Sequence, residues 1–243
     1  MYIRNNVPIL APITESIVAL AMFVLVVSIW QRYLRRKRDA TLYLSVAFTS
    51  YATSVLLTAI GKWLQFGLNI DPEVTSYADF FILLAYTFTA LSNVYLFAFI
   101  DTIFLNKGIK AILPIAILNS ISIGLFIPAI SLKQGSYAAT TPIVLYHALN
   151  TIFLMCILTY VSLRERKKSD EKLPKIGFLL IAFYGVFNLL LFLSFGIDLA
   201  IVYLTEKGYS PFYYLSWVFA LLGLICGYLG YIMPDWFKKL IEH

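Results

Sequence analysis

The sequence is short of charged residues. Asp, Glu, Lys and Arg make up 13% of its 243 residues, whereas hydrophobic residues make up 60%. A soluble domain has about 25% charged and about 45–50% apolar residues. So little charge cannot cover a water-facing surface along the whole chain, which excludes an ordinary soluble domain and predicts that most of the chain lies in lipid.

Histidine and cysteine are also scarce, with two of each. A haem-binding bundle needs paired histidines across helices, and a membrane zinc hydrolase needs several His and Asp ligands. His147 and the terminal His243 supply neither set, so we expect no metal and no haem. Cys156 and Cys226 lie in apolar runs, where we expect small buried side chains rather than a disulfide.

The motifs of several enzyme and cofactor classes are missing as well. The sequence has no glycine-rich phosphate loop, no Gly-x-Gly-Asp pattern and no serine in a nucleophile-elbow context. The last apolar run has no lysine that could form a retinal Schiff base, since Lys207 precedes the run and Lys238 follows it. We therefore expect no catalytic residue, no cofactor and no enzymatic activity.

What the sequence does contain is a series of long apolar runs. Each has about 20 residues or more, which is the length of a helix that crosses a bilayer. The sequence therefore predicts one all-α domain over 1–243, a polytopic membrane helix bundle with seven transmembrane helices. The predicted spans are 8–30, 40–64, 77–105, 111–132, 141–163, 176–203 and 211–233.

The basic residues predict the orientation of this bundle. Fifteen of the nineteen lie on one side of the predicted membrane and four on the other. Positive charge stays in the cytoplasm, so we expect the N-terminus outside and the C-terminus in the cytoplasm of a multi-pass cell-membrane protein. The net charge of +6 then reflects topology, and the expected partner is the lipid bilayer rather than nucleic acid. The fifteen are Arg32, Arg35, Arg36, Lys37, Arg38, Lys107, Lys110, Arg164, Arg166, Lys167, Lys168, Lys172, Lys175, Lys238 and Lys239.

Four asparagines lie near the middle of four different spans. They are Asn93, Asn119, Asn150 and Asn188. Amides at one depth can form a hydrogen-bonded belt that joins the helices, or they can line a ligand cavity or a hydrated path. Both interpretations remain open from the sequence.

Ionisable residues gather in the outer half of the predicted bundle. Glu15, Asp79 and Asp198 fall in the first, third and sixth spans, and His147 lies one turn from Asn150 in the fifth. Ionisable groups inside a membrane are costly and mark functional sites when they face the bundle interior. We expect these five residues to be candidates for binding a cation, an amine or a proton. The alternative is that Asp79 and Asp198 lie in water at the headgroup level.

The last span carries small residues at helical spacing. Gly223 and Gly227 are four residues apart, and Gly230 follows one turn later. Small residues at this spacing let two helix backbones approach closely. We expect the partner to be another helix of the same bundle, with a homodimer as the second interpretation.

The exit from the last span resembles a known signalling module. Residues 227–237 read Gly-Tyr-Leu-Gly-Tyr-Ile-Met-Pro-Asp-Trp-Phe. This ending is similar to that of the seven-helix transmembrane sensor modules of prokaryotic histidine kinases, in which a glycine-rich last helix leaves the membrane through a Pro-aromatic stretch. The resemblance implies a sensor, here without a kinase domain. The Asp-Arg-Tyr and Asn-Pro-x-x-Tyr motifs of G-protein-coupled receptors are missing.

Three functional hypotheses follow. The first is a stand-alone seven-helix receptor or sensor for an extracellular or membrane ligand, read by a cytoplasmic signalling partner at 164–175 and the tail. The second is a small transporter or channel for a cation, a proton or a small solute. The third is a structural subunit of a membrane complex. High usage of Ile, Leu, Lys and Tyr is typical of a prokaryotic protein.

Overall fold

The computed structural model describes residues 7–68, 72–131, 137–205 and 209–242, and the described residues form helices and no strand. Seven helices are long and apolar enough to cross a membrane, which confirms the predicted all-α bundle of seven spans. The elements in chain order are α1 (Leu10–Arg36), α2 (Asp39–Leu68), α3 (Pro72–Ile100), η1 (Asp101–Leu105), α4 (Ile109–Ser131), α5 (Tyr137–Lys168), α6 (Lys172–Thr205), α7 (Pro211–Gly227), η2 (Tyr228–Ile232) and α8 (Asp235–Glu242).

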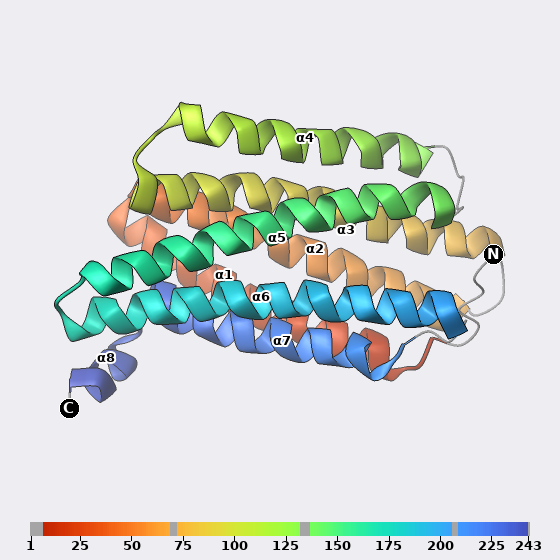
Figure 1. The fold of residues 1–243 in the computed structure, drawn as a ribbon. Coiled ribbons are helices and arrows are strands. Elements are labelled where there is room, and N and C mark those ends of the chain that lie inside the picture. The colour runs from red at the N-terminus through yellow and green to blue at the C-terminus, as the bar shows by residue number, and fades with distance from the viewer. Residues whose placement is uncertain (1–6, 69–71, 132–136, 206–208, 243) are drawn as a thin grey trace.

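The seven long helices run side by side, and the short α8 leaves one end of the bundle at an angle (Figure 1). Of the most apolar 18-residue stretch of each helix, 56% is buried in α2 but only 22% in α4. Thus α2 is central, and α4 lies at the edge beside α3 and α5 with most of its surface facing outward. We call the end that holds 32–38, 164–175 and α8 the basic end, and the other the N-terminal end.

Several helices continue beyond their apolar runs into basic segments. The first helix extends to Arg36 and the fifth to Lys168, past the predicted ends at 30 and 163. Backbone hydrogen bonding within a helix does not require lipid, and cations in the last turn interact favourably with the helix dipole. Lys37 then ends α1 in the left-handed conformation, with φ of 49°.

Both α3 and α7 end in a π-helical segment at the basic end. After η1, Asn106 and Gly108 have positive φ values, which turns the chain sharply into α4. The buried Asp101 carboxylate accepts the backbone N–H groups of Lys107 at 3.1 Å and Gly108 at 2.8 Å. Asp101 therefore fixes this turn, which accounts for its burial.

The glycine face of α7 and η2 packs against α6 of the same chain. A Cβ atom on Gly230 would lie 3.1 Å from the backbone N of Ile181, and one on Gly227 would lie 3.1 Å from Cδ2 of Tyr184. At Gly223 the nearest atom would be Nδ2 of Asn188, at 3.4 Å. In the described part of the chain, α6 therefore covers this glycine face.

Candidate functional site

Three charged side chains are buried within the described part of the N-terminal half of the bundle. Glu15 on α1 is 0% exposed, Lys62 on α2 is 4% exposed and Asp198 on α6 is 2% exposed. Burying charge among apolar helices is costly, so each of these groups needs polar partners. Together with Tyr209 and Tyr213 they form what we call the buried charge cluster.

Tyrosines link these charges to α7. The Tyr213 hydroxyl donates a hydrogen bond to Oε1 of Glu15. Lys62 donates to Oε1 of Gln65 at 3.0 Å and to the Tyr209 hydroxyl at 3.4 Å, and its Nζ lies 5.3 Å from the centre of the Tyr209 ring. The Tyr209 and Tyr213 rings pack edge to face with centroids 5.0 Å apart. A continuous chain of contacts therefore runs from Lys62 to Glu15.

The start of α7 is built so that Tyr213 reaches this cluster. Ser210 caps the helix, because its side chain accepts the backbone N–H of Phe212 at 3.2 Å, and Pro211 supplies a fixed φ at the first helical position. Asp198 in turn accepts the backbone N–H of Ser210 at 2.9 Å. The carboxylate of Asp198 therefore anchors the α7 N-terminus to α6 as well as adding charge to the cluster.

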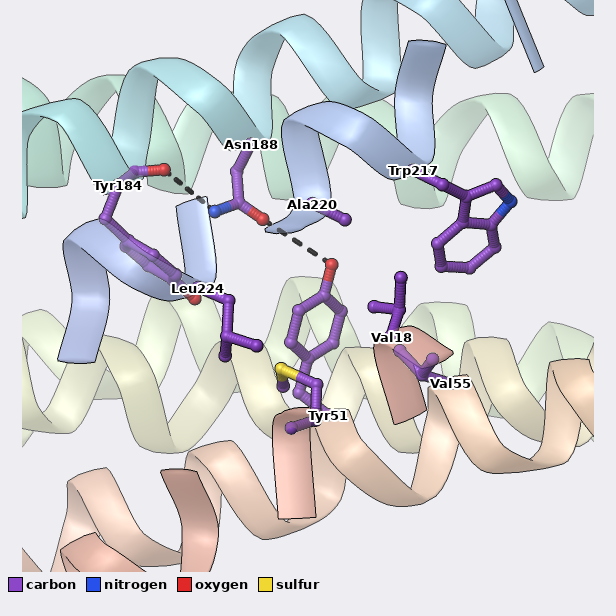
Figure 2. A pocket seen from close by; sticks show the side chains of 9 residues that line it. Val18, Tyr51, Val55, Tyr184, Asn188, Trp217, Ala220 and Leu224 are labelled. Carbon is purple, nitrogen blue, oxygen red and sulfur yellow. Dashed lines mark hydrogen bonds between the residues drawn. The ribbon is translucent and has the colours of Figure 1, made fainter. Parts of the chain in front are cut away.

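Small cavities lie next to this cluster, toward the middle of the bundle. Figure 2 shows the first, about 10 Å³ in volume, between Val18, Tyr51 and Asn188, with Trp217 at one side. The Tyr51 hydroxyl donates to Oδ1 of Asn188 at 3.5 Å, and Asn188 donates to the Tyr184 carbonyl at 2.8 Å. About 10–15 Å³ is enough for one water molecule, so this space suits water and not an organic ligand.

A second cavity of about 10 Å³ shares Tyr51 and Asn188 with the first and extends to Asn93 and Thr151. Asn93 donates to Oδ1 of Asn119 at 3.2 Å and to the Thr151 hydroxyl at 2.8 Å. Two of the four amides thus bond directly to each other, and Asn188 faces them across this cavity. Among the described residues, Nδ2 of the fourth, Asn150, has no hydrogen-bond partner.

His147 lies in a different environment, between α3, α4 and α5. Its side chain is 1% exposed, and its ring centroid lies 5.7 Å from those of both Tyr86 and Phe126. Neither ring nitrogen has a hydrogen-bond partner within the described residues. The structure thus brings Glu15 and Asp198 to α7 and places His147 against α3 and α4. The side chain of Asp79 lies outside the described residues.

Aromatic rings fill the space between the cavities and the basic end. Phe48 lies 5.7 Å from Tyr184 and 5.8 Å from Tyr231, and Phe99 lies 5.3 Å from Tyr231, between ring centroids. These four residues form what we call the aromatic plug. Tyr184 also lines both cavities, so the aromatic plug borders the polar interior.

Sequence reasoning missed Lys62 and the tyrosines. Lys62 lies within the predicted span 40–64, so a lysine inside an apolar run was the available signal. The tyrosines Tyr51, Tyr209 and Tyr213 gave no such signal, because tyrosine is also common where helices meet the membrane surface. Only the contacts between helices show where these hydroxyl groups lie: Tyr51 reaches Asn188 on α6, and Tyr213 of α7 reaches Glu15 on α1.

No protein-family model, no curated protein and no solved structure matches this chain. What the molecule does therefore has to follow from its own geometry.

Proposed function

We propose that the protein is a seven-helix receptor or sensor of the cell membrane, with its N-terminus outside and its C-terminus in the cytoplasm. It responds to a small cationic ligand at the buried charge cluster. The cluster contains two acidic side chains, and carboxylate oxygens are groups to which cations bind. The Tyr209 ring already carries the Lys62 ammonium group, which shows that this part of the cluster accommodates a cation.

One observation carries this proposal: α1 is joined by polar contacts to the start of α7 and, near its other end, to η2, which directly follows α7. Near the N-terminal end Tyr213 bonds to Glu15, and at the basic end Arg32 bonds to the carbonyl oxygens of Tyr231, at 3.0 Å, and Ile232. A ligand that changes the Glu15–Tyr213 contact therefore acts on a helix pair that extends to the basic end.

The basic end is suited to a change of conformation. Its two π-helical segments are each bonded by an arginine from a neighbouring helix, because Arg164 donates to the Phe104 carbonyl of η1 at 3.3 Å just as Arg32 does to η2. A π-helical turn is rare and is frequent at functional sites. A change in the register of η2 would rotate α8, and segment 164–175 and the tail are the surfaces that a cytoplasmic partner would read.

A transporter is the second candidate, and the two cavities at mid-depth favour it. They place Asn188, Tyr51 and Asn93 along a polar line that a proton or a small cation could follow. The aromatic plug borders this line, so transport past the plug would need a second conformation. The amides and the hydrogen-bonded charged residues also suit a structural subunit, which would bind no cation.

Thermal unfolding of the full chain in lipid nanodiscs tests the receptor. We expect one of ammonium, Na⁺ and K⁺ to raise the unfolding temperature, and Glu15→Gln to abolish the increase, because the cavities beside the cluster have volumes of about 10 Å³. Glu171→Gln is the matched control, because Glu171 is an exposed acid at the basic end. No increase with any of the three cations, or an unchanged increase in Glu15→Gln, contradicts the proposal. Cation or proton flux in liposomes, lost in Glu15→Gln, would establish the transporter instead.

A further inference from the structure

The last helix, α8, has two chemically different sides. Its apolar residues are Trp236, Phe237, Leu240 and Ile241, and the four other residues are charged. Positions i, i+1, i+4 and i+5 lie on one side of an α-helix. Eight residues therefore form an amphipathic helix with one continuous apolar face.

The bundle covers only half of that face. Ile241 is 7% exposed where α8 packs against α6, whereas Trp236 is 60% exposed and Leu240 is 70% exposed. Trp236 and Leu240 are one turn apart, so they form a ridge that the described part of the chain leaves uncovered. We call these two residues the apolar ridge.

The position of α8 relative to the spans indicates what covers this ridge. The last apolar span ends at Ile232, and α8 begins three residues later. Met233 between them has a φ of 43°, and Pro234 follows, so the chain turns instead of continuing along α7. Figure 1 shows α8 at an angle at the end of the bundle. This is the depth at which a bilayer changes from hydrocarbon to headgroups.

The charges on the other face agree with a membrane surface. Lys238 bonds to Asp235 at 2.8 Å, and this hydrogen bond lowers the pKa of the Asp235 carboxyl group, so this carboxylate stays ionised at neutral pH. Lys239 is exposed and adds to the basic residues of 32–38 and 164–175. Basic residues at this level attract the anionic headgroups of the cytoplasmic leaflet.

We propose that α8 is an interfacial helix whose apolar ridge inserts into the lipid leaflet at the basic end. Tryptophan suits this position, because its ring is apolar and its N–H remains able to bond at the headgroup level. The helix lies on the membrane with Lys239 toward water, and it holds the chain that leaves η2 close to the bilayer. This role does not depend on the identity of any ligand at the buried charge cluster.

Spin labels on α8 test the proposal in the full chain in nanodiscs of phosphatidylcholine and phosphatidylglycerol. Cys156 and Cys226 are first replaced by serine, and Leu240→Cys is then compared with Lys239→Cys as the matched control. We expect the label at 240 to be accessible to oxygen and shielded from a water-soluble nickel chelate, and the label at 239 to show the reverse.

Two outcomes would overturn it. Equal access of the nickel chelate to both labels would mean that the ridge faces water. Shielding of position 240 from both reagents would mean that a protein, either a partner or a second copy, covers the ridge instead of lipid. A further experiment without spin labels controls for misfolding caused by the labels. Leu240→Ser should speed tryptic cleavage after Lys239 in nanodiscs several-fold, with an unchanged unfolding temperature. Cleavage at the wild-type rate counts against insertion.

Discussion

At the scale of single residues, hydrogen bonding distinguishes buried polar groups that stabilise the bundle from buried polar groups that do not. Asn93 bonds to Asn119 and Thr151, whereas both ring nitrogens of His147 have no hydrogen-bond partner among the described residues. A buried polar group without a partner costs about 1–3 kcal/mol, and its replacement by an apolar group of similar shape can be neutral or stabilising. The two residues should therefore respond oppositely to the same kind of substitution.

We predict that His147→Leu leaves the free energy of unfolding unchanged or raises it by about 1 kcal/mol. Asn93→Leu should lower it by about 1–3 kcal/mol, because Asn119 and Thr151 lose their partner. Thermal or denaturant unfolding in one lipid mixture measures both. A His147→Leu variant that unfolds as readily as Asn93→Leu would show that the imidazole has a stabilising partner after all.

A hydrogen bond between Glu15 and Tyr213 joins α1 to α7 near the N-terminal end. Tyr213→Phe removes the donor and leaves the carboxylate buried, so we predict a loss of about 1–3 kcal/mol of unfolding free energy. In a Glu15→Gln background the same substitution should cost less, because a hydrogen bond to a neutral amide is weaker than one to a carboxylate. A double-mutant cycle measures this difference. Additive losses would indicate that the two side chains are not coupled.

At the scale of elements, the glycine face of η2 depends on close contact with α6. A Cβ atom at position 230 would meet Ile181 Cγ1 at 3.0 Å, the Ile181 backbone N at 3.1 Å and the Gly177 carbonyl at 3.2 Å. Two of these three atoms belong to the backbone, so the steric overlap can be relieved only if the two helices move apart. Gly196 on α6 differs, because nothing lies within 4 Å of the corresponding position.

We predict that Gly230→Val lowers the free energy of unfolding by about 1–3 kcal/mol through overpacking. Gly196→Ala should raise it by about 0.5–1 kcal/mol, since alanine favours a helix interior over glycine. Both variants are measured by unfolding in the same nanodiscs. If Gly230→Val has no effect, α6 and η2 do not pack as closely as described.

The number and type of the long helices could be predicted from the sequence. A span such as 111–132 is recognisable because length and apolarity alone satisfy the bilayer. The ends were less predictable, because α5 continues through Arg166 to Lys168, where water replaces lipid. The π-helical segments and the buried role of Lys62 could not be predicted, because they depend on which helices become neighbours.

At the scale of the whole molecule, the question is whether a change at the buried charge cluster reaches the basic end. Glu15 of α1 bonds to the start of α7, and Arg32 of α1 bonds to η2, which directly follows α7. The aromatic plug fills the space around Tyr231, so a movement of α7 must be accommodated by these rings. A well-packed interior transmits strain rather than absorbing it.

Hydrogen exchange measures this coupling without any ligand. We predict that Glu15→Gln changes backbone exchange in 228–242, because it weakens the contact that positions the start of α7, whereas Glu171→Gln does not. Arg32→Gln should by itself increase exchange in 228–232, since the carbonyl groups there lose their donor. In the double variant Glu15→Gln with Arg32→Gln, the additional effect of Glu15→Gln should shrink, because the far contact through which it acts is gone. If Glu15→Gln changes exchange in 228–242 as much in the double variant as alone, the coupling runs through the packed rings around Tyr231 and not through the polar contacts of α1. If Glu15→Gln has no effect on exchange in 228–242, the physical basis for a receptor is removed.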